Sequence, residues 1–129
     1  DGCGFLTEEG RCGIHPFRPG ICRLFPLGRY YEENGFRYFL QVHECQKENR
    51  AKVKVKKWLD TPDLKKYEAY IARWHGLLIQ LQEYIAAHPE SAKAVSMDVL
   101  KRFYLTPYQT EEFYSEFFQR MDEGKKAYC

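Results

Sequence analysis

The sequence has no long apolar run, no strong excess of charge of one sign and few cysteines for its length. No stretch approaches the roughly 18 to 20 apolar residues that span a bilayer, and no basic segment followed by an apolar one opens the chain. The net charge is only +2, while 44% of the residues are hydrophobic and 16% are aromatic. Disordered chains show the opposite balance. We therefore expect a folded, soluble, cytoplasmic protein with no membrane partner.

The length of 129 residues is typical of one compact domain, so we predict a single domain over 1–129. Within it we expect a cysteine-bearing loop and hairpin over 1–46, a basic connector over 47–60, a helical part over 61–124 and a tail over 125–129. The chain begins Asp1-Gly2-Cys3 without an initiator Met. We expect from this start that the chain is processed or is a piece of a longer protein.

The N-terminal part shows two local signals. Pro19 suits the first turn of a short helix over 21–25, which Pro26 ends. Two aromatic-rich runs then flank Asn34-Gly35, the dipeptide typical of a type I′ hairpin turn. We predict strands over 29–33 and 36–42, and a hairpin that brings the chain back toward the loop cysteines. Because an isolated hairpin is marginal in water, its aromatic face is expected to pack on the helices that follow.

The second half shows the periodicity of helices. Apolar residues recur at spacings of three and four from Leu64 to Ile85, which predicts one long amphipathic helix that starts at 61–63 and stops before His88-Pro89. A second helix is expected over 90–104, and a third from a Thr110 cap to about Gly124. The predicted fold class is α+β, mainly α: a cysteine-bearing loop region with one β-hairpin packed on a small three-helix bundle.

A basic run occupies the connector. The segment contains one acidic residue, Glu48, and six basic residues: Lys47, Arg50, Lys52, Lys54, Lys56 and Lys57. We expect it to form an exposed strand or the approach to a helix around Trp58-Leu59. Nucleic-acid binding is one explanation, since lysines beside aromatic residues attract phosphates and stack bases. However, residues 1–60 hold 11 basic and 8 acidic side chains, a net of +3, and residues 61–129 hold 9 and 10, a net of −1. A solvated, charged edge strand is the commoner explanation, so we expect no nucleic-acid partner.

We expect Trp58 and Trp74 to be core residues rather than a binding platform.

Four of the five cysteines lie in the first third of the chain: Cys3, Cys12, Cys22 and Cys45. The total of five cysteines is odd and far below the roughly 8–10% of disulfide scaffolds, which favours a metal site over structural disulfides or unlinked buried thiols. No pair has the C-x2-C spacing, but four thiolates suit tetrahedral zinc or an iron–sulfur cluster. Cys22 near a helix N-terminus is favoured as a thiolate. His15 and His43 are possible substitute ligands, although a structural role is commoner. Cys129 is expected to be an exposed thiol in a frayed tail.

Three segments in fixed order are distinctive: Cys3-Gly4-Phe5-Leu6, then Gly10-Arg11-Cys12-Gly13-Ile14-His15, then Arg18-Pro19-Gly20-Ile21-Cys22-Arg23-Leu24-Phe25-Pro26. They closely resemble the YkgJ-type cysteine-cluster family, a zinc- or iron-chelating family that includes flagellin N-methylase, and the likeness covers roughly the first half of the chain. It implies that the four cysteines bind an iron–sulfur cluster or zinc. Members usually carry a further C-x2-C-x2-C-C cluster upstream, which this sequence does not contain. We therefore expect a fragment that lacks that cluster.

Two arginines flank Cys22. Arg18 and Arg23 either compensate the charge of an anionic sulfur centre, or recognise an anionic substrate, or pin the loop by pairing with a carboxylate such as Glu8, Glu9 or Glu44. We expect the pinning role.

These observations leave two main functional hypotheses. The first is an iron–sulfur redox or protein-modifying protein, with lysine methylation of a protein substrate implied by the flagellin N-methylase resemblance. The second is a non-catalytic zinc module that binds a protein. No glycine-rich cofactor turn and no general-base constellation is evident in the sequence.

Overall fold

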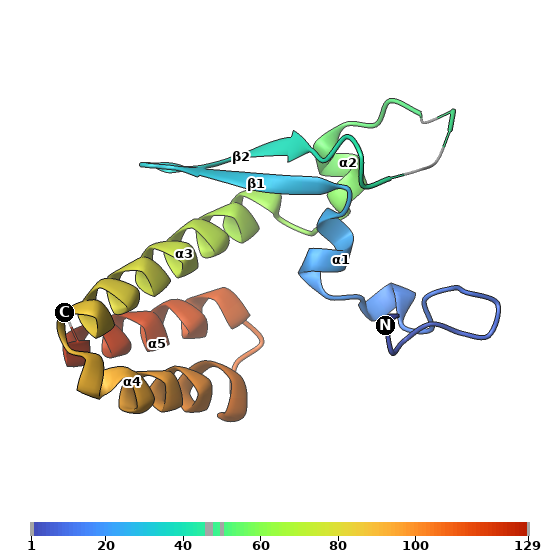
Figure 1. The fold of residues 1–129 in the computed structure, drawn as a ribbon. Coiled ribbons are helices and arrows are strands. Elements are labelled where there is room, and N and C mark those ends of the chain that lie inside the picture. The colour runs from blue at the N-terminus through green and yellow to red at the C-terminus, as the bar shows by residue number, and fades with distance from the viewer. Residues whose placement is uncertain (1, 46–47, 50, 129) are drawn as a thin grey trace. The chain divides into compact units, whose positions relative to one another are not determined.

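The computed structural model describes residues 2–45, 48–49 and 51–128, so the expectations for Lys47, Arg50 and Cys129 lie outside the described residues. The fold is α+β and mainly α, with one two-stranded antiparallel sheet among the described residues (Figure 1). The chain divides into two compact units, an N-terminal unit (Asp1–Thr61) and a helical unit (Pro62–Cys129). This border coincides with the expected change from connector to helix. The expectations of a single domain and of a hairpin packed on the helices stay predictions.

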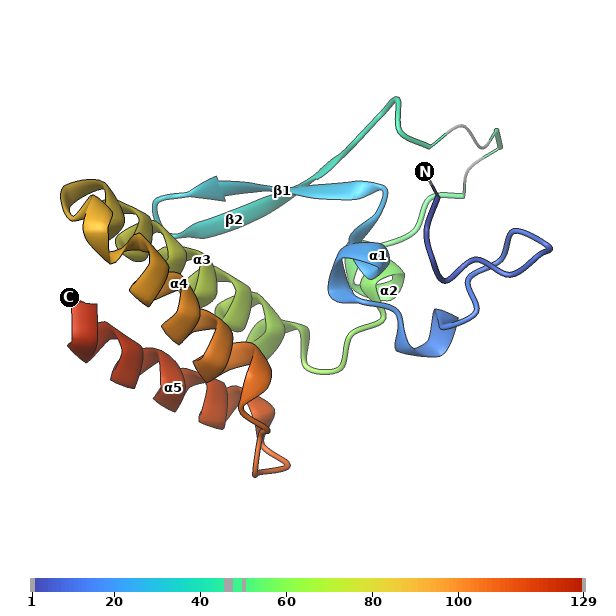
Figure 2. The same cartoon turned by 60° about the horizontal axis from the view of Figure 1, so that its bottom comes forward.

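The N-terminal unit contains short elements. Along the chain these are η1 (His15–Phe17), α1 (Gly20–Leu24), β1 (Leu27–Glu32), β2 (Gly35–Leu40) and α2 (Val55–Leu59). The short helix is confirmed as α1, with Pro19 as its N-cap. Figure 2 shows α1 beside α2. The described residues of 51–54 form no strand and lead into α2, so the connector approaches a helix and is not an edge strand.

The hairpin forms, but its turn differs from the expected one. The register pairs Leu27 with Leu40 and Glu32 with Gly35, so Glu33 and Asn34 are the two turn residues. Neither has a positive φ, which a type I′ turn requires at both positions, so the predicted Asn34-Gly35 type I′ turn is wrong. Gly35 takes a φ of 143° as the first residue of β2, a conformation that suits glycine.

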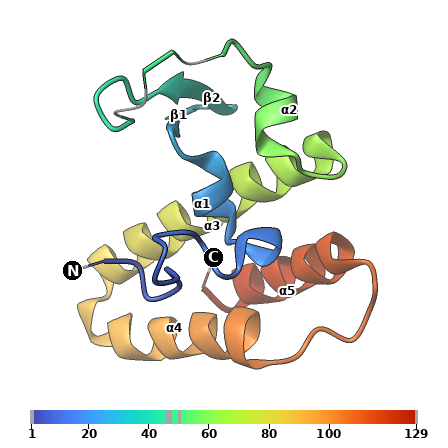
Figure 3. The ribbon, with the colours of Figure 1, turned by 90° about the vertical axis from the view of Figure 1, so that its right-hand side faces the viewer.

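The helical unit contains the elements α3 (Leu64–Ala87), η2 (Pro89–Ser91), α4 (Ala92–Val99), η3 (Leu100–Leu105) and α5 (Phe113–Tyr128) (Figure 3). The long predicted helix is confirmed as α3. Its N-cap Asp63 accepts the backbone N–H of Lys66 at 3.3 Å, and His88 ends it before Pro89. None of the helices in the described ranges is both long and apolar enough to cross a membrane.

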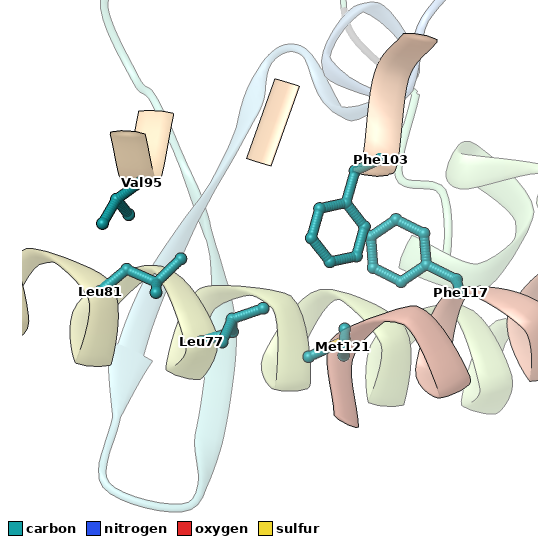
Figure 4. Packing of buried hydrophobic residues seen from close by; sticks show 6 residues of the cluster. All are labelled: Leu77, Leu81, Val95, Phe103, Phe117 and Met121. Carbon is teal, nitrogen blue, oxygen red and sulfur yellow. The ribbon is translucent and has the colours of Figure 1, made fainter. Parts of the chain in front are cut away.

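The core of the helical unit is formed by six buried side chains from α3, α4, η3 and α5, shown in Figure 4: Leu77, Leu81, Val95, Phe103, Phe117 and Met121. Trp74 packs against this core, with its ring centroid 4.8 Å from that of Phe103 and 5.2 Å from that of Phe117. Its predicted core role is confirmed. Trp58 in the N-terminal unit is 43% exposed, so the same prediction is wrong for Trp58.

The second and third predicted helices form with unpredicted features. The second predicted helix is α4, and the chain continues from it as the π-helix η3. The backbone carbonyls at the end of such a helix have no hydrogen-bond donor within the helix. The third, α5, begins at Phe113, so Thr110 lies before it and bonds to the Glu116 carboxylate. It continues past Gly124 to Tyr128, so the described part of the predicted 125–129 tail is helical.

One buried arginine joins α5 to the end of η3. Arg120 donates to the carbonyl oxygens of Arg102 at 2.6 Å, Thr106 at 2.8 Å and Pro107 at 2.7 Å, and to the Glu116 carboxylate at 2.5 Å. Desolvation alone would raise the pKa of Glu116, but the hydrogen bonds from Arg120 and two backbone N–H groups lower it. The carboxylate therefore stays ionised beside the guanidinium.

We expect Arg120→Met to destabilise the helical unit by on the order of 3 kcal/mol, because it leaves three carbonyls and a carboxylate without their donor. Urea unfolding followed by helical circular dichroism measures this. The matched control is Arg73→Met, which removes an exposed pair with Asp122 and is expected to cost about 1 kcal/mol or less. Equal losses in the two variants would contradict the role of Arg120.

Tyr70 provides a pH-dependent test of the same unit. Its ring packs against Phe113, Tyr114 and Phe117, and burial, together with neighbouring tyrosines, raises its pKa from 10.0 to about 12. The neutral phenol is favoured in the folded state, so this stabilisation is complete below pH 10 and is lost as the pH rises toward about 12. We expect Tyr70→Phe to lose less thermal stability between pH 9 and pH 11.5 than the wild-type chain. An identical loss would show that Tyr70 is not responsible.

Candidate functional site

The candidate site is the loop region that carries the four cysteines. Its first part folds back on itself. The N–H of Leu6 bonds to the Cys3 carbonyl at 3.2 Å, Leu6 and Cys12 form an isolated antiparallel bridge, and the N–H of Gly13 bonds to the Phe5 carbonyl at 2.8 Å. A Cβ at Gly13 would lie 3.3 Å from that carbonyl oxygen, so the close approach of the two segments favours glycine. The sequence between Cys3 and Cys12 is therefore an ordered loop.

The tip of this loop is closed by Thr7. Its N–H bonds to the Arg11 carbonyl at 2.7 Å, its carbonyl accepts the Gly10 N–H at 2.9 Å, and Gly10 adopts a φ of 71°. A hydrogen bond with the Thr7 side chain lowers the pKa of Glu9, with help from a backbone N–H. Glu9 is thus engaged within the loop tip and does not serve as the expected partner of Arg18 or Arg23.

Arg18 ties η1 to the chain that follows it. Its Nη1 donates to the His15 carbonyl at 2.9 Å and lies 3.2 Å from His15 Nδ1. Because a guanidinium only donates, Nδ1 is the acceptor in this contact. This contact gives His15 the structural role that we expected to be commoner. The role of His43 as a substitute ligand stays a prediction.

Arg23 ties three segments together. Its Nη2 donates to the Pro16 carbonyl in η1 at 3.2 Å, and its Nη1 donates to the carbonyl of Asp60 at the end of α2, also at 3.2 Å. Both arginines therefore pin the loop. Their partners are carbonyl oxygens and a histidine ring, and not the expected carboxylates of Glu8, Glu9 or Glu44. The sequence does not indicate which backbone carbonyls these arginines bond to, because every residue carries one.

The hairpin returns the chain to α1. Gln41 follows β2, and its N–H bonds to the Pro26 carbonyl at 3.0 Å while its Nε2 donates to the Leu27 carbonyl at 3.0 Å. Cys45 lies four residues after Gln41, and Cys22 lies four residues before Pro26. The segments that carry Cys22 and Cys45 therefore adjoin the same end of the sheet, where β1 begins and β2 ends. The approach of Cys45 to the loop cysteines stays a prediction.

The four thiols are accessible to different degrees. Cys3 and Cys22 are exposed, Cys12 and Cys45 are half-buried, and all four are free. Cys22 is the third residue of α1, and its N–H bonds to the Pro19 carbonyl at 2.9 Å. The described side chains include no three His, Cys, Asp or Glu residues grouped closely enough to hold a metal ion. The donor chemistry of four thiols fits zinc or an iron–sulfur cluster, but their placement in this structure does not form a closed ligand set.

No family model, curated protein or solved structure matches the chain.

We expect Arg23→Gln to speed amide hydrogen exchange in α1 roughly thirtyfold, because it removes two hydrogen bonds of about 1 kcal/mol each that hold this short helix. Exchange in α3 should not change. The matched control is Arg11→Gln, a change of the same kind at an exposed position on the loop tip. Unchanged exchange in α1 of Arg23→Gln would show that the two carbonyl contacts do not stabilise the helix.

Proposed function

We propose that this chain is a metal-binding cysteine-cluster protein, in which Cys3, Cys12, Cys22 and Cys45 supply thiolates to an iron–sulfur cluster or to zinc. One observation supports this most directly: four free thiols lie in a unit that buries little apolar surface. In the described part of the N-terminal unit, Leu24 and Leu59 are the buried large apolar side chains, at 3% and 1% exposure. Such a unit needs a further source of stability.

The magnitudes favour a metal as that source. Burial of two leucines contributes about 3–6 kcal/mol, whereas ordering each residue of the chain costs about 1–2 kcal/mol. A structural zinc site contributes about 10–16 kcal/mol in small domains. Metal binding would therefore outweigh any apolar term in this unit. To form one ligand set, the loops of Cys3, Cys12 and Cys45 would have to move toward α1, and short elements held by a few polar contacts permit such movement.

The favoured form of the proposal is an iron–sulfur protein with a redox or protein-modifying role. A cluster would supply one-electron chemistry at the loop region. The resemblance of the first half of the chain to the flagellin N-methylase family favours a protein substrate and lysine methylation. Free thiols at all four described cysteines are typical of a reducing compartment, which supports a cytoplasmic location.

A second candidate function is a structural zinc module that binds a protein, and it is supported by exposed apolar side chains in the N-terminal unit. Phe17 is 86% exposed and Ile21 is 69% exposed. Both lie within five residues of Cys22. Large apolar side chains exposed at nearby positions of the chain are typical of interaction surfaces.

Metal and sulfide analysis of the full chain, purified without oxygen, tests the proposal. Loss of one ligand is expected to weaken the affinity for metal at least about tenfold, since the loss of even an outer partner costs about that much, and dialysis against a competing chelator before the analysis turns this into a lower metal content. We therefore expect this drop in each of Cys3→Ser, Cys12→Ser, Cys22→Ser and Cys45→Ser. Cys129→Ser is the matched control and should keep the wild-type content.

The outcomes separate the two functions. Iron with acid-labile sulfide and visible absorption supports the redox protein, and colourless protein with zinc supports the structural module. A chain without metal, or a Cys129→Ser variant that loses as much as the others, would contradict the proposed ligand set.

A further inference from the structure

The connector carries a lysine cluster that the proposed metal site does not use. We define the lysine cluster as Lys52, Lys54, Lys56 and Lys57, which are all exposed. None of the four forms an ion pair with another residue of the described ranges. No acidic residue occurs between Glu48 and Asp60. The explanation as a charged edge strand does not apply, because this segment forms no strand.

The geometry of α2 gathers part of this cluster beside an exposed indole. Leu59 is 1% exposed and marks the inner side of the helix, while Trp58 is 43% exposed. Each residue of an α-helix advances by about 100° around the axis. Lys54 and Lys57 therefore lie on the side away from Leu59, with Lys54 between Lys57 and Trp58. Two ammonium groups and an aromatic ring share one outer face.

The indole of Trp58 is held in place. Its Nε1 donates to the Phe25 carbonyl at 3.1 Å, so the ring is oriented by a fixed backbone atom at the end of α1. The Phe25 side chain is itself 46% exposed. Arg23 reinforces this arrangement, because its bond to the Asp60 carbonyl fixes the end of α2. A surface whose lysines serve only to keep the protein solvated has no use for an exposed aromatic ring held in one orientation. The presence of this ring beside the lysines therefore favours a binding role.

We propose that this face of α2 binds single-stranded nucleic acid, with Lys57 and the N-cap residue Lys54 contacting phosphates and Trp58 stacking on a base. Lysine contacts to phosphates release counterions and supply affinity without sequence preference. Stacking on an aromatic ring requires an unstacked base, which a single strand offers and a duplex does not. An acidic polypeptide would satisfy the lysines but would leave the oriented indole without a role. The surface is therefore better suited to a single strand.

Fluorescence anisotropy of a labelled oligothymidine of about 16 nucleotides tests this with the full chain. The logarithm of the binding constant is expected to fall with the logarithm of the salt concentration between about 50 and 200 mM salt. Each lost phosphate contact lowers that slope by about 0.7 for a single strand, so Lys54→Gln/Lys57→Gln should lower it by about 1.4. The matched control Lys125→Gln/Lys126→Gln, on α5, should leave the slope unchanged.

The stacking part of the proposal has its own readout. Trp58→Ala is expected to weaken binding about tenfold, and Trp58→Phe, which keeps an aromatic ring, should lose less. In a Trp74→Phe background, Trp58 is the sole tryptophan, and its fluorescence should be quenched when oligothymidine binds. Polyglutamate of equal charge is the competing ligand. It should bind more weakly and without quenching.

Three results would overturn the proposal. The first is no change of anisotropy at the lowest salt concentration. The second is a salt slope that Lys54→Gln/Lys57→Gln leaves unchanged. The third is binding of polyglutamate as tight as that of oligothymidine, which would assign the face to an acidic protein. No member of the lysine cluster is a proposed metal ligand, so the wild-type chain and the variants are compared at equal metal content, and a loss of oligothymidine binding at unchanged metal content concerns this face alone.

Discussion

Hydrogen bonds from a few side chains to carbonyl oxygens determine how the N-terminal unit is arranged. Among the described residues of this unit, the two buried leucines form too small a core for its roughly sixty residues. Arg23, Arg18, Gln41 and Trp58 instead each donate to the backbone of another segment or turn. Such bonds are directional and each contributes about 1 kcal/mol. The unit is therefore well specified in geometry but weakly stabilised, and a ligand that binds it contributes a large share of its free energy of folding.

The helical unit uses the same kind of bond in addition to a core. Its six core residues remove apolar area from water, while Arg120 satisfies carbonyls at the end of the π-helix η3. A helix end leaves carbonyls without intrahelical donors, and a guanidinium offers several donors in one plane. The two units thus share arginine as the residue that completes irregular backbone. They differ in what else holds them, since the helical unit would remain partly stabilised by its apolar contacts without Arg120.

Sequence reasoning predicted the elements whose signals are local. The apolar periodicity and His88-Pro89 define α3, and the two aromatic runs define the hairpin, because these patterns depend only on neighbouring residues. It placed the hairpin turn one residue late, since register depends on which strand residues pair across the sheet. The π-helix has an apolar pattern that also suits an α-helix. The exposure of Trp58 and the bond from Arg23 to the Asp60 carbonyl depend on segments that are distant in sequence, and local sequence patterns do not specify them.

The cysteine loops and the face of α2 are physically connected through α1. Arg23 bonds to η1 on one side and to the end of α2 on the other, and Phe25 at the end of α1 accepts the Trp58 N–H. A shift of α1 that draws Cys22 into a ligand set must either break these bonds or move α2 with it. Because the bonds join the two helices at two points, a rigid movement of both preserves more hydrogen bonds than a movement of α1 alone. The orientation of Trp58 and the placement of Cys22 are therefore set by the same contacts, and neither can change independently at low energetic cost.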